Sequence, residues 1–180
     1  TKASVAKHAV EAGADIVNDV SGLSFDNNMA GIVQSLYVPV VIMHMKGNPQ
    51  NMQLNPKYKD IVNEILDFFK MKIKIATQSG INRSKIILDP GIGFGKTVEH
   101  NFELLSRLNE FNVLELPIMI GPSRKSFIGI TLDLPPEDRV EGTAAAVSAG
   151  VMNGASIVRV HDVKSMKRVV RIIEKIRNVQ

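Results

Sequence analysis

Residues 85–93, KIILDPGIG, decide how this chain folds, because an almost continuous apolar run ends there in an aspartate and a glycine-rich turn. An apolar run without alternating polar positions is typical of a strand buried on both faces of a parallel sheet. Ligands of parallel sheets bind beyond the carboxyl ends of the strands. The stretch therefore predicts a buried strand, with Asp89 at the end where a ligand binds.

The same pattern recurs along the chain. Four further runs have it: ADIVNDVSG (14–22), VPVVIMHMKG (38–47), LPIMIGPSRK (116–125) and ASIVRVHDV (155–163). Helical patterns lie near residues 27–36, 98–110, 138–153 and 164–178, and the clearest runs from Asn55 as N-cap, with Pro56 at the first helical position, toward Gly80. Three helix-to-strand joints, AGADIV, SGINRSKIIL and NGASIV, place a glycine where a helix ends. This alternation predicts an α/β fold with a parallel sheet and right-handed crossovers.

The ends of all five predicted strands are polar. They carry Asn18 and Asp19, His44, Asp89, Ser123 with Arg124 and Lys125, and Arg159 with His161 and Asp162. A barrel gathers residues from all its strands into one bowl, which favours a (βα)8 TIM barrel. Five strands cannot close such a barrel, so we expect a truncated one of about five βα units, a single domain over residues 1–180 with the first three strands absent. The chain lacks an initiator Met and begins in a helical pattern, as a piece of a longer protein would.

Composition and charge narrow the class of protein. The 22 basic and 18 acidic residues leave a formal charge of +4, a mild bias and not a nucleic-acid footprint. The basic run KSMKRVVRIIEKIR (164–177) has apolar residues at helical spacing and is typical of an amphipathic surface helix. The absence of cysteine excludes disulfides and thiolate–metal sites and fits a cytoplasmic enzyme. No apolar run approaches the roughly 18 residues of a membrane span, so we expect a soluble protein that binds neither nucleic acid nor membrane.

The glycine-rich turn extends to DPGIGFGKTVE (89–99), which at first sight looks like a phosphate-binding loop. Gly95, Lys96 and Thr97 fit the end of the motif G-x-x-x-x-G-K-[ST], but Pro90 stands at the first glycine position. Proline lacks the N–H that a phosphate cradle needs, and the carboxylate of Asp89 would repel a phosphate. The glycines also run G-x-G-x-G and not G-x-G-x-x-G, the dinucleotide fingerprint. We therefore expect a different ligand.

Five motifs in this order carry a resemblance to a known family: VNDVSG, VVIMHMKGNPQNMQ, ILDPGIGFGK, IGPSRKSFIG and IVRVHDV. They closely resemble the last five strand-end motifs of the dihydropteroate synthases, and the resemblance covers essentially the whole chain. It implies a TIM barrel that condenses 6-hydroxymethyl-7,8-dihydropterin pyrophosphate with p-aminobenzoate to give 7,8-dihydropteroate and pyrophosphate in folate biosynthesis. The family is a sulfonamide target, and its first three strands are absent here, so we expect the isolated chain to be inactive.

The resemblance also implies roles for particular residues. The pterin would be bound by Asn18, Met43, Asp89, Phe94, Gly121 and Lys125, p-aminobenzoate by Ser123, and pyrophosphate by Arg159 and His161. The catalytic set would be Lys125, Arg159 and His161. The resemblance implies Mg²⁺ as cofactor, with its ligand in the missing N-terminal part, and a homodimer. A pterin presents adjacent donors and acceptors, which suit a carboxylate aided by an amide and an ammonium group, and residues 90–95 would let the backbone approach it closely.

Several of these residues also have simpler interpretations. Asp89 before a proline can cap a turn, and Met43, Met45 and Met52 can fill a core. We interpret His44 as structural. Two other functions stay open: a pterin-dependent corrinoid methyltransferase, which is not expected to carry S-R-K and R-V-H together, and a non-catalytic pterin-binding remnant. Arg159 between two valines needs an anionic partner, which favours a functional site.

Overall fold

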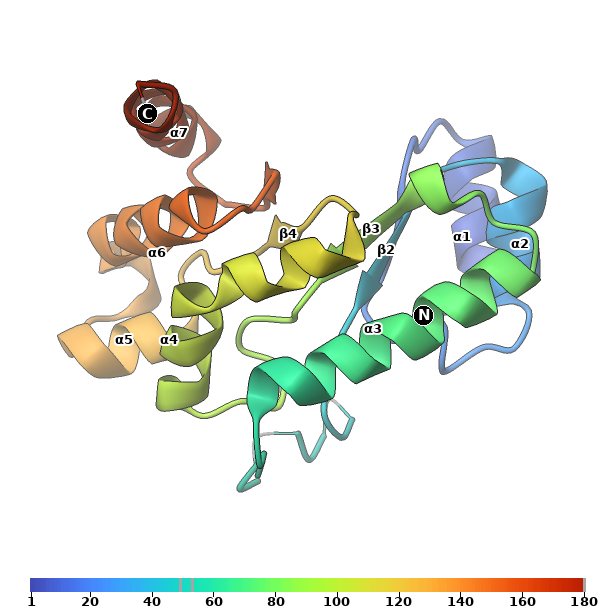
Figure 1. Ribbon diagram of the computed structural model, residues 1–180, viewed down its shortest axis with the longest axis horizontal. Coiled ribbons are helices and arrows are strands. Elements are labelled where there is room, and N and C mark those ends of the chain that lie inside the picture. The colour runs from blue at the N-terminus through green and yellow to red at the C-terminus, as the bar shows by residue number, and fades with distance from the viewer. Residues whose placement is uncertain (49, 53, 180) are drawn as a thin grey trace.

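The computed structural model describes residues 1–48, 50–52 and 54–179 (Figure 1). The strands are β1 (Val17–Asp19), β2 (Val40–Met43), β3 (Ile86–Asp89), β4 (Met119–Ile120) and β5 (Ile157–Val158). The α-helices are α1 (Ala3–Glu11), α2 (Met29–Leu36), α3 (Ile61–Gln78), α4 (Val98–Ser106), α5 (Ser126–Leu132), α6 (Val140–Met152) and α7 (Val163–Arg177). Short 3₁₀ helices are η1 (Arg83–Lys85), η2 (Leu108–Leu114) and η3 (Pro136–Asp138).

All strand pairs are parallel and follow the order of the sequence. β1, β2 and β3 form one sheet in that order, and β4 pairs with β5. A parallel bridge between Leu88 and Ile118 joins the two sets. Each strand thus lies beside the next one in the chain, without the reversal of strand order that a doubly wound sheet contains. The predicted α/β fold with parallel strands is confirmed.

The helices pack around the strands in sequential groups. α1 and α2 pack against each other at one end of the molecule, and α6 and α7 do so at the other (Figure 1). The long helix α3 contributes much of the core between them, with Phe69 in edge contact with Phe111 of η2 at 5.8 Å between ring centroids. Across the described residues, no helix is both long and apolar enough to cross a membrane.

The ends of the helices test the local predictions. Gly13, Gly80 and Gly154 have φ of 106°, 89° and 105°, so the predicted left-handed glycines at three helix ends are confirmed. The predicted start of the long helix is wrong. Asn55 has φ 51°, and α3 begins at Ile61, where the Asp60 carboxylate accepts hydrogen bonds from the N–H groups of residues 62 and 63, both at 3.1 Å. An N-cap that accepts two N–H groups outweighs the Asn-Pro signal upstream.

Burial of the strands follows the prediction except at the last one. All residues of β2 and β3 are buried, as expected for strands covered on both faces. In β5, by contrast, Ile157 and Val158 are only half-buried, so the expectation of a fully buried strand is wrong there. β5 has β4 on one side, and no strand pairs with its other edge among the described residues.

Candidate active site

The strand register places the predicted site residues on one face. Four apolar residues, one from each of β2 to β5, pack together: Val41, Ile87, Met119 and Ile157. Side chains alternate between faces along a strand, so the residues two positions further on share this face. Those residues are Met43, Asp89, Gly121 and Arg159. The structure therefore brings four of the predicted residues onto one face, beyond an apolar floor.

Asn18 occupies the lower layer at the edge of the sheet. It pairs with Val41 in the β1–β2 register, and its side chain is exposed. It faces the same side as Asp89, because Val41 pairs with Ile87, two residues before Asp89. Asn18 is thus on the predicted face, one step below the carboxylate.

Asp89 is a buried carboxylate surrounded by cations. Its side chain is 5% exposed and accepts a hydrogen bond of 2.7 Å from the N–H of Gly91. Burial raises the pKa of Asp89 to about 6, and the charges of Lys96, Arg159 and Lys125 oppose that rise. A buried carboxylate needs hydrogen-bond donors to offset the loss of water. A ligand that brings N–H groups would supply further donors.

The glycines after Asp89 are required by contact with another loop of the protein. Gly91 and Gly95 have φ of 70° and 63°. A Cβ atom at Gly91 would lie 1.9 Å from the carbonyl oxygen of His44, and one at Gly95 would lie 2.3 Å from that of Lys46. These glycines let the turn pack on the segment that follows β2, and the close approach of residues 90–95 to a ligand stays a prediction.

Lys125 and Phe94 form one wall above the carboxylate. The Lys125 ammonium lies 4.0 Å from the centroid of the Phe94 ring, a cation–π contact. The stem of Lys125 passes over Gly93, where a Cβ atom would lie 3.0 Å from the lysine Cδ. Burial lowers the pKa of Lys125, and the nearby charge of Arg159 adds to the effect. The two residues predicted for the same ligand are in contact.

Ser123, Arg159 and His161 line a polar cavity of about 530 Å³ together with Gly121, Arg124 and Lys125. The Ser123 hydroxyl shares a hydrogen bond of 2.9 Å with His161 Nδ1 and accepts another of 3.2 Å from the His161 N–H. Gly121 lies beside Arg159, since a Cβ atom there would be in van der Waals contact with the arginine Nε at 3.5 Å. Several cationic side chains at one cavity suit an anionic ligand.

An ion pair that the sequence analysis missed supports this cavity. Arg124 donates two hydrogen bonds to the Asp162 carboxylate, at 2.8 and 3.1 Å. It thereby joins the loop after β4 to the loop after β5. The sequence shows both residues as polar strand ends, but nothing in their spacing pairs them.

Lys96 and His44 form a second feature that sequence reasoning missed. Lys96 is 3% exposed and donates to the Phe94 carbonyl at 2.9 Å, while its Nζ lies 3.1 Å from His44 Nδ1. A buried lysine that bonds within its own loop supports the rejection of a phosphate-binding loop. The His44 ring also packs edge-on against Phe68 at 5.0 Å between centroids, which fits the structural role predicted for it.

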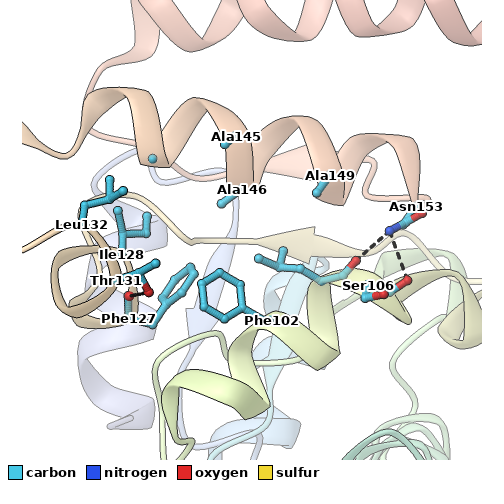
Figure 2. Close-up of a pocket in the computed structure, with 12 residues that line it drawn as sticks. Phe102, Ser106, Phe127, Ile128, Thr131, Leu132, Ala145, Ala146, Ala149 and Asn153 are labelled. Carbon is cyan, nitrogen blue, oxygen red and sulfur yellow. Dashed lines mark hydrogen bonds between the residues drawn. The ribbon is translucent and has the colours of Figure 1, made fainter.

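A separate cavity of about 480 Å³ lies between α4, α5 and α6 (Figure 2). Phe102 and Phe127 face it from below, and alanines of α6 line the opposite side (Figure 2). Its polar groups include Asn153, which donates to the carbonyls of Leu105 and Ser106 at 2.8 and 3.2 Å. No charged side chain is among the described residues that line it, so it lacks groups for the chemistry considered above.

These features define an α/β protein with a buried carboxylate and a cavity lined by cationic side chains at the carboxyl ends of parallel strands, the end at which α/β proteins bind their ligands. The family model described as pterin binding enzyme matches residues 1–161. The chain belongs to this family of pterin-binding enzymes.

Its relatives are dihydropteroate synthases. The enzyme of Synechocystis is 45% identical over 175 residues, which are 97% of this chain and 61% of the relative. A crystal structure of Yersinia pestis dihydropteroate synthase with a sulfonamide drug has a TM-score of 0.96 and 40% identity, covering 99% of this chain and 65% of that one. The Clostridium difficile enzyme, in the presence of pteroic acid, has a TM-score of 0.90 and 44% identity, covering 97% and 64%. The chain thus spans about 61% of the length of a curated relative.

Proposed function

We propose that this chain is the pterin-binding C-terminal portion of a dihydropteroate synthase, folded as one domain that forms a truncated (βα)8 barrel. The observation that carries the proposal is the position of Met43, Asp89, Gly121 and Arg159 on one face, with Lys125 over Phe94 beside it. The sequential parallel strand order supports the barrel. In the whole protein this site would serve the transferase reaction that joins a pterin to p-aminobenzoate.

Pterin recognition would centre on Asp89. Its carboxylate would accept hydrogen bonds from the ring N–H and the amino group of the pterin, and Lys125 would donate to the ring acceptors. Met43 and Phe94 would contact the faces of the ring, while Asn18 would add an amide at the lower layer. Burial of Asp89 strengthens such bonds because water does not compete for them.

The reaction needs a stabilised leaving group more than a protein nucleophile. The C–O bond of the pterin methylene breaks, and its electron pair leaves with pyrophosphate, whose charge Arg159 and His161 would bind. The amine lone pair of p-aminobenzoate then forms the new C–N bond, and the nitrogen loses a proton. Ser123, at the same cavity, would contact p-aminobenzoate. Orientation and charge stabilisation would supply the catalysis.

Mg²⁺, a homodimer and a cytoplasmic location are further proposals that rest on the family resemblance and the composition. Among the described residues, no three His, Cys, Asp or Glu side chains are close enough to hold a metal ion, so the groups present do not form a Mg²⁺ site by themselves. The apolar side chains exposed near the cavity of Figure 2, such as Phe102 and Leu132, support a homodimer.

Titration of 6-hydroxymethylpterin into the purified chain, followed by pterin fluorescence, tests the proposal. The chain contains no tryptophan that would mask the signal. We expect saturable binding that Asp89→Asn reduces at least about a hundredfold, because it removes a charged acceptor of two hydrogen bonds. Asp67→Asn is the matched control, since Asp67 lies on α3 with its side chain 77% exposed. Equal binding by wild type and Asp89→Asn would refute the assignment.

A further inference from the structure

Lys96 is a buried cation that the proposed reaction does not use. It follows the turn after β3, and its two hydrogen-bond partners, the Phe94 carbonyl and His44 Nδ1, belong to different segments. An ammonium group has donors and no acceptor. In its ammonium form Lys96 therefore donates to Nδ1, and the proton of the neutral His44 ring then lies on Nε2.

The segments that Lys96 joins are both parts of the pterin site. Phe94 contributes the ring beneath Lys125, and His44 directly follows Met43. The His44 N–H in turn donates to the Asp89 carbonyl at 2.9 Å. Tyr58 also stabilises this turn, since its hydroxyl donates to the Gly95 carbonyl at 2.8 Å.

We propose that Lys96 is a positioning residue of the pterin site: by bonding both the Phe94 carbonyl and the His44 ring, it holds the turn of residues 90–95 so that Phe94 and Asp89 face the ligand together. This inference rests on the proposed function. Lys96 is the lysine that ends the G-F-G-K sequence. In a phosphate-binding loop the lysine at this position would contact the phosphate, whereas here it bonds within the protein.

The charges around Lys96 support the same role. Burial lowers the pKa of Lys96 to about 7, against the effect of Asp89, while Lys125 and Lys46 lower it further. Burial, aided by the charges of Lys96 and Lys46, lowers the pKa of His44 to about 2, so the ring is a neutral acceptor. Lys96 also keeps the pKa of Asp89 lower than burial alone would set it, as Arg159 and Lys125 do. Loss of Lys96 should therefore make Asp89 harder to ionise.

The test compares Lys96→Met with Lys70→Met, a control on α3 whose lysine is 60% exposed. Three quantities are measured for wild type and both variants: pterin affinity from pH 5 to pH 8, amide hydrogen exchange of residues 91–95, and the thermal unfolding midpoint. We expect Lys96→Met to bind pterin about tenfold more weakly, the size of effect that loss of one charge-assisted hydrogen bond produces. The amides of residues 91–95 should exchange faster in this variant. The loss of pterin affinity at low pH, here called the acid limb, should occur at higher pH than in wild type, because Asp89 is harder to ionise without Lys96. Lys70→Met should match wild type.

Wild-type affinity and an unchanged acid limb in Lys96→Met would overturn the inference, even with a lower unfolding midpoint, because a purely structural lysine would give that result. If Lys96→Met does not fold, the ¹⁵N shifts of His44 in the wild type decide at pH 6: a proton on Nε2 supports the bond from Lys96, and a proton on Nδ1 refutes it. A folded wild type that binds no pterin would refute the proposed function. Hydrogen exchange in Lys96→Met would still show whether Lys96 orders the turn.

Discussion

Substitution of Gly91 by alanine should destabilise the chain severely. A Cβ atom there would lie 1.9 Å from the His44 carbonyl oxygen, a main-chain atom that cannot rotate away. The residue also has φ 70°, where a side chain costs about 1–2 kcal/mol. Because the overlap is relieved only by moving the segment that follows β2 or the turn itself, we expect a total loss of about 3–5 kcal/mol.

Urea unfolding followed by circular dichroism measures this loss. With a slope of about 2 kcal/mol per molar urea, the midpoint should fall by roughly 1.5–2.5 M. Gly31→Ala is the matched control, because Gly31 lies in α2 and a Cβ atom there would meet nothing within 4 Å, and it should stabilise the chain by about 0.5–1 kcal/mol. A Gly91→Ala midpoint within about 0.25 M of wild type, which is about 0.5 kcal/mol at this slope, would refute the reasoning, since the backbone would then have relaxed without cost.

Two further predictions concern charge. The pKa of Asp89 is raised to about 6 from 3.8, so its contribution to stability is lost as pH rises from about 4 to 6. The pKa of Lys96 is lowered to about 7 from 10.5, so stability increases again as pH rises above 7. In Asp89→Asn the unfolding midpoint should no longer fall between pH 4 and 6, and a fall retained in that variant would contradict the assignment. Arg124→Gln and Asp162→Asn should each lower the unfolding midpoint only slightly, because solvent reaches both side chains, and a double-mutant cycle should show coupling between them. Strictly additive effects would mean that the ion pair contributes nothing.

The parts of the fold that the sequence predicts are those set by local patterns. Continuous apolar runs predicted the strands around Val41 and Ile87, and glycines predicted the helix ends at Gly13 and Gly80. The same patterns placed Asp89 at a strand end, where the structure has it. Periodicity of two along neighbouring strands is then enough to bring residues from separate motifs onto one face.

The parts that could not be predicted depend on contacts between segments distant in sequence. The start of α3 was misplaced because Asp60 competes with Asn55, and only the folded loop decides between them. The bond between Lys96 and His44 spans 52 positions, and nothing in either motif indicates it. Residue 91 must likewise be glycine because of the His44 carbonyl, which belongs to another loop. The sequence alone does not indicate that contact.

The packing of this turn also limits how the site can change over evolution. Gly91 and Gly95 exclude any side chain because of the backbone they touch, and Ile92 is 1% exposed in the core. Gly93 has φ 81° and lies against the stem of Lys125. Phe94 is therefore the one half-buried side chain that residues 91–95 contribute to the wall of the proposed site. Substitutions that adapt the site to a new ligand or reduce the binding of an inhibitor should therefore occur at Phe94 within this stretch, and otherwise in other loops.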